Sequence, residues 1–401
     1  MNKTLPIGSD DFRKIREKGA YYVDKTLMLK DFIEYKDEVA LITRPRRFGK
    51  SLNMTMIREF FDITKDSRQI FEGLLIMKTS YAVQLNSRPV IYFTFKDCTG
   101  MTADALLFNL NNVIFQEYER YYKFLYGCAD AKSGFYKTFL DLYYVLQKRN
   151  ASWNQVSISI QVLEQVVTEF YEISPIVLID EYDQPILNSY EYQYHEELKE
   201  YLSNLFSLAL KGQESMYSAL LTGIQRVAKE SIFSKLNNFK VYTVRDSKYS
   251  AYFGLTNDET KKLLEDFDLE LNDGVRDKYD GYIFGGRSIY NPWSILCYAD
   301  KKELNKFWVN TSTNLLIRKS MEHAGKSFMN DFQELIAKGN ALVPVKLETS
   351  FLELEDDYTR WGLFINSGYL TITGGDDEIM EVRVPNEEVR SEFRAIVAAY
   401  S

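Results

Sequence analysis

The sequence predicts an α/β fold in which a buried parallel sheet lies between two layers of helices. Short apolar runs, typical of strands buried on both faces, alternate with segments of helical periodicity. One run leads into a basic loop that opens a helix, and another ends in a pair of carboxylates. Because parallel strands end at one edge of a sheet, both polar motifs are expected at that edge.

Composition limits the class of protein. The 401 residues suffice for two or three domains, and the net charge of −8 argues against broad nonspecific nucleic-acid binding, although a local basic patch stays open. No membrane span and no signal peptide are expected, because no run of about 20 apolar residues exists and the N-terminus has no apolar core. Three separated cysteines and two histidines give no metal or redox spacing. A cytoplasmic protein is therefore expected.

Residues 1–38 form a lead-in to the first buried run. Tyr21-Tyr22-Val23 is expected to be extended or a short strand, and a short helix is expected over Leu27 to Glu34. Asp24 or Thr26 can cap this helix.

The next stretch has the pattern of a phosphate-binding loop. The apolar run Val39 to Ile42 predicts a strand, and a helix is expected from Ser51, after Gly49 and Lys50. Backbone N–H groups at such a helix start hold phosphate oxygens, Lys50 would reach the β- and γ-phosphates, and Ser51 would ligate Mg²⁺. Residues 1–38 would then pack near the base of the bound nucleotide, although a plain capped helix explains this segment equally well. The candidate ATP-binding residues are Arg44, Pro45, Arg46, Arg47, Phe48, Gly49, Lys50, Ser51 and Leu52.

One position departs from the general pattern. That pattern has glycine five residues before Gly49, where this sequence has Arg44. The loop must turn without that glycine, or Arg44 must take a backbone angle that glycine tolerates better. Three arginines beside Lys50 exceed what one triphosphate needs, so one is expected to project toward a neighbour or the lid. An accidental Gly-Lys-Ser in an ordinary strand-turn-helix is the alternative.

Further elements lead to a second motif. A strand is expected over Arg88 to Phe95, two helices over residues 103–149 with a break around Gly127 to Gly134, and a helix over 156–173. The apolar run 176–179 then ends in Asp180-Glu181 and is followed by Asp183.

These carboxylates are the partner of the basic loop. Asp180 would hold Mg²⁺ through water, and Glu181 would orient or deprotonate the attacking water. Asp183 could add a polar group or cap the next segment. An apolar run before Asp-Glu is weak alone and strong when paired with the loop.

A third buried run, Tyr217 to Gly223, predicts a further strand. In ATPases with an inserted central strand, such a strand carries a group that senses the γ-phosphate. Thr222 is the candidate, with Arg226 as a charge stabiliser, so the candidate catalytic residues are Glu181, Thr222 and Arg226. A strand end and a surface arginine explain these residues equally well. Together the motifs predict a P-loop NTPase of the ASCE/AAA-like type, with a three-layer parallel sheet.

The C-terminal half predicts a mainly helical lid. The boundary is placed near Thr256, which gives an ATPase domain over 1–256, a lid or winged-helix-like subdomain over 257–385, and a helix start over 386–401. Residues 229–257 are expected to hold a short strand and loops. The lid is expected to contain a helix over Asp258 to Phe267, a hairpin over 279–290, a helix near Pro292, and a hairpin that turns at 374–377.

The sequence is similar to the bacterial predicted AAA-ATPase-like proteins, which commonly carry a C-terminal PD-(D/E)xK nuclease-like domain. The resemblance implies an ATP-binding α/β domain with a helical lid, and that family also has arginine where Arg44 stands. The nuclease part would follow residues 384–389. Here no matching motif follows, and apolar positions of the last helix lack an obvious partner, so a truncated or short chain without nuclease activity is expected. The motifs that carry the resemblance lie at 22–26, 43–51, 178–183, 232–238, 279–282, 290–293 and 367–370.

Three functions stay open. The first is a Mg²⁺-dependent ATPase that regulates a C-terminal nuclease-like domain or a partner. The second is a nucleotide-gated switch or scaffold that hydrolyses slowly or not at all. The third is a nucleic-acid-acting module in which Arg44, Arg46 and Arg47 contact DNA phosphates. The oligomeric state stays open as well.

Overall fold

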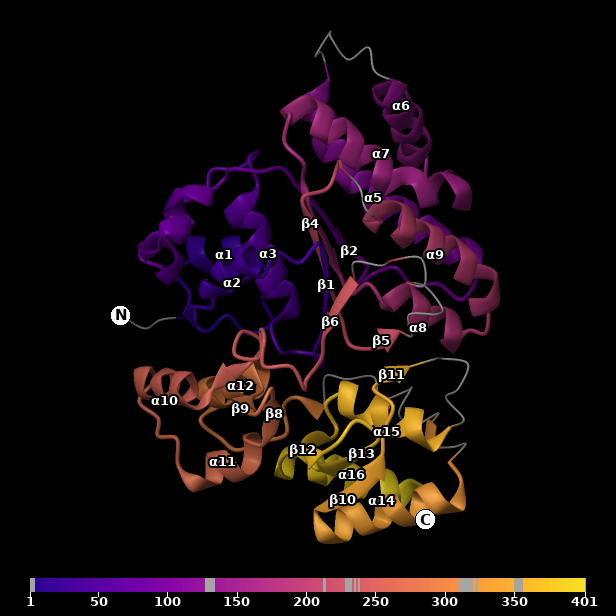
Figure 1. Cartoon of the computed structure of the whole chain (residues 1–401). Coiled ribbons are helices and arrows are strands. Elements are labelled where there is room, and N and C mark those ends of the chain that lie inside the picture. The colour runs from indigo at the N-terminus through magenta and orange to yellow at the C-terminus, as the bar shows by residue number, and fades with distance from the viewer. Residues whose placement is uncertain are drawn as a thin grey trace.

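A parallel sheet forms the centre of the molecule (Figure 1). A computed structural model describes residues 4–126, 134–211, 214–227, 233, 236, 239–309, 320–321, 324–349 and 356–400, with the backbone alone over 395–400. The strands are β1 (Val39–Thr43), β2 (Val90–Thr94), β3 (Ile176–Asp180), β4 (Ser218–Gly223) and β6 (Phe239–Tyr242).

The strand order confirms that a strand is inserted at the centre of the sheet. It is β2-β3-β4-β1-β6, and all neighbours pair in parallel. Strand β4 pairs with β1, where Val39 faces Ala219, and with β3, where Val177 faces Ala219. The ends of β1 and β3, which carry the two motifs, therefore lie on either side of β4.

Helices cover both faces of the sheet, as predicted. Alternate residues of one strand enter different cores: Leu178 packs with the first helices of the chain, and Ile179 packs with the helices between β2 and β4. In Figure 1 the first group lies on one side of the strands and the second on the other. The first layer holds α1 (Phe12–Glu17), α2 (Leu27–Tyr35) and α3 (Lys50–Phe61), and the second holds α5 (Ala103–Leu125), α6 (Gly134–Gln147), α7 (Trp153–Tyr171), α8 (Gln184–Glu191) and α9 (His195–Leu210).

Sequence patterns missed or shifted some helices. Helix α7 starts at Trp153, three residues before the predicted start, because Ser152 and Gln155 form a capping box. Helices α8 and α9 were not predicted. The short turns α4 (Arg68–Phe71), η1 (Leu75–Lys78) and η2 (Ser80–Gln84) fill the connection from α3 to β2.

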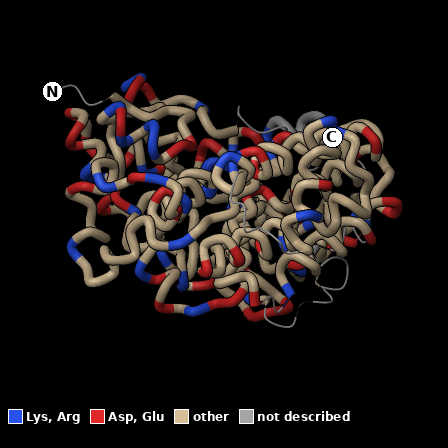
Figure 2. The backbone as a smooth tube through the Cα atoms, turned by 90° about the horizontal axis from the view of Figure 1, so that it is seen from above, with Lys and Arg blue, Asp and Glu red and all other residues tan. Residues whose placement is uncertain are grey.

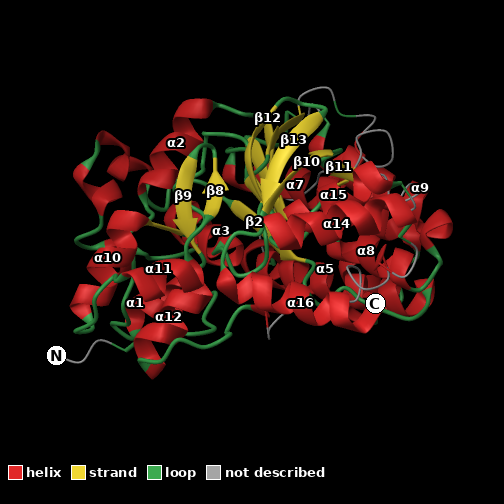
Figure 3. Cartoon of the chain, turned by 90° about the horizontal axis from the view of Figure 1, so that it is seen from below, coloured by secondary structure: helices red, strands yellow, loops and turns green. Residues whose placement is uncertain are grey.

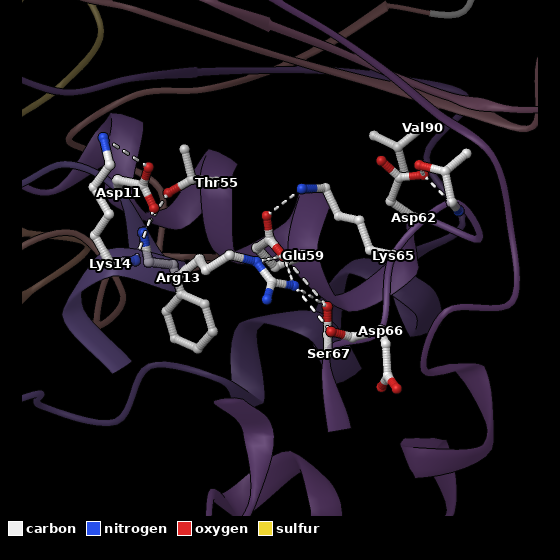
Figure 4. Close-up of polar contacts among 12 residues, drawn as sticks. Asp11, Arg13, Lys14, Thr55, Glu59, Asp62, Lys65, Asp66, Ser67 and Val90 are labelled. Atoms are coloured by element: carbon white, nitrogen blue, oxygen red, sulfur yellow. Dashed lines mark hydrogen bonds and ion pairs between the residues drawn. The ribbon is translucent and has the colours of Figure 1, made fainter. Parts of the chain in front are cut away.

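A buried carboxylate fixes the lead-in to the helix that follows the basic loop (Figure 4). Glu59 of α3 is 5% exposed and pairs with Arg13 of α1 at 2.7 Å and with Lys65 at 2.7 Å. The backbone N–H of Phe12 also donates to the Thr55 hydroxyl of α3 at 3.1 Å. Helix α1 is thereby held in place against α3.

The C-terminal region, residues 255–400, combines helices with two small antiparallel sheets (Figure 3). Both predicted hairpins are confirmed, and each has a third strand that was not predicted. One sheet holds β7 (Leu255–Thr256), β8 (Tyr282–Phe284) and β9 (Arg287–Tyr290), and the other holds β10 (Asn340–Pro344), β12 (Thr371–Gly375) and β13 (Ile379–Arg383). The helices are α10 (Asn257–Asp266), α11 (Asp273–Tyr279), α12 (Pro292–Lys301), α14 (Lys326–Lys338), α15 (Asp357–Asn366) and α16 (Glu387–Tyr400).

The last helix corrects an expectation about its apolar face. Val389 and Phe393 of α16 are fully buried, and the Phe393 ring lies 5.1 Å from Phe332 and 5.7 Å from Phe364. This part of the face thus packs within the chain, on residues too distant in sequence for a pattern to indicate. The side chains of 395–400, and the predicted motif at 232–238 except for residues 233 and 236, lie outside the described residues.

Charges of both signs are distributed over the molecule. Figure 2 shows Lys and Arg interspersed with Asp and Glu along the chain. Within the described residues, no helix is both long and apolar enough to cross a bilayer.

We expect Glu164→Gln to change the pH dependence of stability. Glu164 of α7 is fully buried, neither of its side-chain oxygens has a hydrogen-bond partner among the described residues, and burial raises its pKa well above the ordinary value. Folding therefore becomes less favourable as pH rises from the unfolded pKa of about 4.3, by up to about 1.4 kcal/mol per pH unit until the folded pKa is reached.

Urea unfolding at several pH values would measure this effect. The Gln variant should gain stability relative to wild type above about pH 5, and the gain should vanish at lower pH. Glu169→Gln, on an exposed position of the same helix, is the matched control. A pH-independent difference between Glu164→Gln and wild type would contradict the expectation.

Candidate nucleotide-binding site

The basic loop joins β1 to α3, and its backbone oxygens bind the side chain of Lys50. The Lys50 Nζ atom donates to the backbone oxygens of Arg44 and Pro45, each at 3.0 Å. Burial lowers the pKa of Lys50, and the nearby Glu181, Asp180 and Asp183 carboxylates oppose that effect. Lys50 is thus a buried cation that faces carboxylates from β3 and is held by its own loop.

The loop turns at Arg47 and Gly49 and not at Arg44. Arg47 has a φ of 68° and Gly49 a φ of 86°, whereas Arg44 is not among the residues with positive φ. The alternative in which Arg44 takes a glycine-like angle is therefore wrong. Left-handed backbone costs a residue such as Arg47 about 1 kcal/mol, which the surrounding contacts must offset.

The Arg44 side chain points away from the loop into the core. It is fully buried, its Nη1 donates to the backbone oxygens of Thr43 at 2.7 Å and Tyr242 at 3.1 Å, and burial lowers its pKa to about 10. Its guanidinium carbon lies 5.5 Å from the Phe253 ring centre and 5.3 Å from that of Phe284. Only the backbone of Arg44 faces Lys50, so its guanidinium is not placed to bind phosphate.

The remaining loop residues divide between the cavity and the C-terminal region. Arg46 and Arg47 line a cavity of about 410 Å³, together with Gly49, Lys50 and Ser51. Phe48 is fully buried, and its ring lies 4.9 Å from Tyr282 and 5.1 Å from Phe284. Phe48 therefore anchors the loop, and the arginines supply positive charge to the cavity.

A second, apolar cavity of about 80 Å³ adjoins the first. The two share six lining residues, among them Gly49, Leu52 and Leu296. Tyr21, Tyr22 and Val23 of the lead-in form part of its wall. A polar cavity joined to an apolar one suits a ligand with a charged end and a flat ring.

Two hydroxyl groups act on the Asp180 carboxylate. Thr222 of β4 donates to Asp180 Oδ1 at 2.5 Å, and Ser51 also hydrogen-bonds this carboxylate. Burial raises the pKa of Asp180, while Ser51 and Thr222 oppose the rise. Ser51 and Asp180 are thus adjacent oxygen groups, as a Mg²⁺ site beside a triphosphate needs. The hydroxyl of Thr222 is directed at Asp180.

Glu181 follows β3 in a sharp turn. Its φ is 52°, a left-handed value that a residue other than glycine rarely adopts. It lines the larger cavity, and its carboxylate is near enough to Lys50 to oppose the lowering of the lysine pKa by burial. Strained backbone of this kind is common at functional sites.

Asp183 and Arg226 make different contacts in the segment after β4. Asp183 accepts hydrogen bonds from the backbone N–H groups of Ile224 at 2.9 Å and Gln225 at 2.8 Å, and burial raises its pKa to about 6. Arg226 lies in β5 (Arg226–Val227), which pairs with β11 (Glu348–Thr349), and it forms an ion pair with Glu348. Arg226 is not one of the described residues that line the larger cavity.

Sequence reasoning missed several residues that line the larger cavity, and three of them are charged or aromatic. Lys96 follows β2, and the neighbouring Phe95 N–H donates to the Asp180 backbone oxygen at 2.9 Å, which brings Lys96 beside the end of β3. Asp10 of the lead-in pairs with Lys96 at 3.4 Å. Trp293 lies 4.3 Å from the Arg47 guanidinium carbon. A polar residue just after a buried strand was the available signal for Lys96.

The sheet order and the site define the class of protein. A strand inserted between the loop strand and the carboxylate strand, with Gly-Lys-Ser opposite Asp-Glu, is the arrangement of a P-loop nucleoside triphosphatase. The model of the AAA-ATPase_like family, described as "Predicted AAA-ATPase", matches residues 6–233, so the chain belongs to that family. Membership of this family supports nucleotide binding of the ATPase type.

Individual relatives are distant. A protein of Azotobacter chroococcum mcd 1, described as an uncharacterized protein in the vnfD 5′ region, is 29% identical over 408 residues, which cover 97% of this chain and 69% of that one. The Aeropyrum pernix ORC2 protein in ADPNP–ADP complexes has a TM-score of 0.29 and 11% identity, with 93% of both chains covered. Drosophila ORC bound to AT-rich DNA and Cdc6 has a TM-score of 0.20 and 10% identity, with 96% of this chain and 91% of that one covered.

Proposed function

We propose that this protein binds ATP with Mg²⁺ and hydrolyses it. The observation that carries the proposal is that Lys50 and Ser51 of the loop line one cavity with Glu181, while Ser51 also hydrogen-bonds Asp180 at the end of β3. The adjoining apolar cavity would take the base, and the first N–H groups of α3, which a helix leaves without intrahelical acceptors, would hold phosphate oxygens.

Each residue has a separate part in the proposed reaction. Ser51 and Asp180 would hold Mg²⁺, which neutralises charge on the phosphates. Lys50, Arg46 and Arg47 would orient the phosphate chain and stabilise the charge that develops on it. Glu181 would orient the attacking water and accept its proton. Thr222 would fix the orientation of Asp180 through their 2.5 Å hydrogen bond.

Titration of a fluorescent ATP analogue in the presence of Mg²⁺ tests the binding site. Wild type should bind with saturation, and Lys50→Ala should lose binding because it removes the buried cation that faces the phosphates. Lys248→Ala is a matched control, because Lys248 stacks on Tyr35 at 4.1 Å and lies outside both cavities. Equal binding by wild type and Lys50→Ala would overturn the proposed site.

We expect Lys96 to favour ATP over ADP. Both side chains of the Lys96–Asp10 ion pair are more than half exposed, so the pair adds little stability. An anionic ligand can therefore replace Asp10 as the partner of Lys96. Because Lys96 follows β2, whose last residue pairs with Asp180 at the end of β3, we expect the terminal phosphate to be the group within its reach. Lys96→Gln should weaken ATP about tenfold and ADP much less, the loss expected for one charge-assisted hydrogen bond.

The partner substitution provides a test of opposite sign. Asp10→Asn frees Lys96 and removes negative charge, so it should tighten ATP binding. Calorimetric titration of both nucleotides into the two variants measures both effects. Equal weakening of ATP and ADP in Lys96→Gln would show that Lys96 does not distinguish the terminal phosphate.

Nucleotide binding would regulate a C-terminal nuclease-like domain or a separate partner. Contacts between the loop and the C-terminal region, such as Phe48 with Tyr282, support such coupling. Limited proteolysis with and without ATP would separate an ATPase from a switch: protection without appreciable turnover indicates the switch. Direct DNA binding by the three arginines has less support, because Arg44 is buried and Arg47 stacks on Trp293.

A further inference from the structure

Two tryptophans of the C-terminal region hold the basic loop from outside. The Trp308 indole Nε1–H donates to the backbone oxygen of Arg46 at 3.1 Å. The Trp293 ring stacks on the Arg47 guanidinium, whose carbon lies 4.3 Å from the ring centre. Both arginines line the larger cavity, so their positions depend on these two aromatic side chains.

One carboxylate joins the segments that carry both tryptophans. Glu388 Oε1 accepts hydrogen bonds from the backbone N–H groups of Phe307 at 2.5 Å and Trp308 at 2.7 Å. Its Oε2 accepts from the hydroxyl of Ser294, the residue after Trp293, at 2.8 Å. Glu388 is 2% exposed and lies in the first turn of α16.

We propose that Glu388 is a positioning residue that couples α16 to the nucleotide site. Its three hydrogen bonds fix Trp308 and the start of α12, and these in turn fix the backbone of Arg46 and the side chain of Arg47. Hydrogen bonds to a buried carboxylate are strong, and each donor left without an acceptor is costly. The identity of the ligand rests on the proposed function, whereas the coupling of Glu388 to the loop is a property of the protein alone.

Coupling of this kind acts in both directions. A partner that displaces Glu388 or shifts α16 would weaken nucleotide binding, and nucleotide binding would stabilise α16 by the same free energy. Helix α16 is therefore the element through which an attached domain or partner would sense the loop.

Hydrogen–deuterium exchange of the nucleotide-free protein is the first test. In Glu388→Gln the amide group of the new side chain places an N–H donor among the three donors that now bind the carboxylate. The peptide that spans residues 44–52 should therefore exchange faster, whereas exchange in α7 should be unchanged. Glu387→Gln is the matched control, because Glu387 is half exposed and pairs only at longer range with Arg390 at 3.9 Å and Arg394 at 3.4 Å. Unchanged loop exchange, or equally faster exchange in α7, would overturn the proposal.

A milder variant protects the test against misfolding. Ser294→Ala removes one donor and leaves the carboxylate in place, so it should accelerate loop exchange less than Glu388→Gln and in the same peptide. Affinity for Mg²⁺ with ATP should fall roughly tenfold in Glu388→Gln, about the loss expected for one charge-assisted hydrogen bond, and less in Ser294→Ala.

The outcomes separate this inference from the proposed function. If wild type binds no ATP while Glu388→Gln still accelerates loop exchange, the proposed function fails and the coupling stands. If wild type binds ATP and Glu388→Gln retains both wild-type affinity and wild-type loop exchange, the coupling fails and the proposed function stands.

Discussion

Glu181→Gln should lower the rate of ATP hydrolysis about a hundredfold or more, with nucleotide affinity retained. General-base catalysis typically contributes between two and four orders of magnitude, and an amide cannot accept the proton of water. The substitution conserves size, so the strained turn at φ 52° and the contacts around Lys50 should survive. Loss of rate without loss of binding identifies an interaction made only in the transition state.

Phosphate release and a binding titration on the same sample measure the two quantities. Asp97→Asn is the matched control: Asp97 is exposed after β2, and the larger cavity is not lined by it. It should hydrolyse ATP like wild type. If Glu181→Gln also keeps the wild-type rate, another group activates the water; if wild type itself binds ATP and does not turn it over, the nucleotide-gated switch is the better description.

Arg44→Gly should destabilise the fold by about 2–4 kcal/mol, although it restores the general phosphate-loop pattern. The substitution empties a fully buried site, removes two ring contacts and leaves the Thr43 and Tyr242 carbonyl oxygens without their donor. Recovery of the cost of burying the guanidinium offsets part of this loss, since two of its nitrogens, Nε and Nη2, have no hydrogen-bond partner within the described part of the chain.

Arg47→Gly makes the same chemical change three residues later and should have the opposite profile. Glycine relieves the positive φ at this position, which offsets the lost stacking on Trp293, so stability should change little. Nucleotide affinity should fall, because Arg47 lines the larger cavity, where the phosphates are proposed to bind. Urea unfolding and ATP titration of both variants measure the contrast. A stable Arg44→Gly variant with tighter ATP binding would show that the general pattern, and not the buried arginine, suits this loop.

The sequence by itself determined the class of fold and the two ends of the site. Strands buried on both faces must be apolar throughout, and a loop that cradles phosphate needs Gly49, Lys50 and Ser51 in consecutive positions, so local pattern was sufficient for both. The apolar run of β4 was visible in the same way, whereas its place between β1 and β3 was expected only by analogy with ATPases that have an inserted strand. The apolar strands and the Gly-Lys-Ser loop can be recognised locally because each depends on residues that are adjacent in the sequence.

Only the tertiary structure decided what each basic residue faces. Arg44, Arg46 and Arg47 are alike in sequence, yet one is buried beside Phe253 and Phe284, and the other two line the cavity. Lys96 reaches the site because β2 lies beside β3, although more than 80 residues separate them. Glu388 meets Trp308 and Ser294 only through the packing of α16. Such contacts depend on burial and on which strands and helices become neighbours, and neither property has a local sequence period.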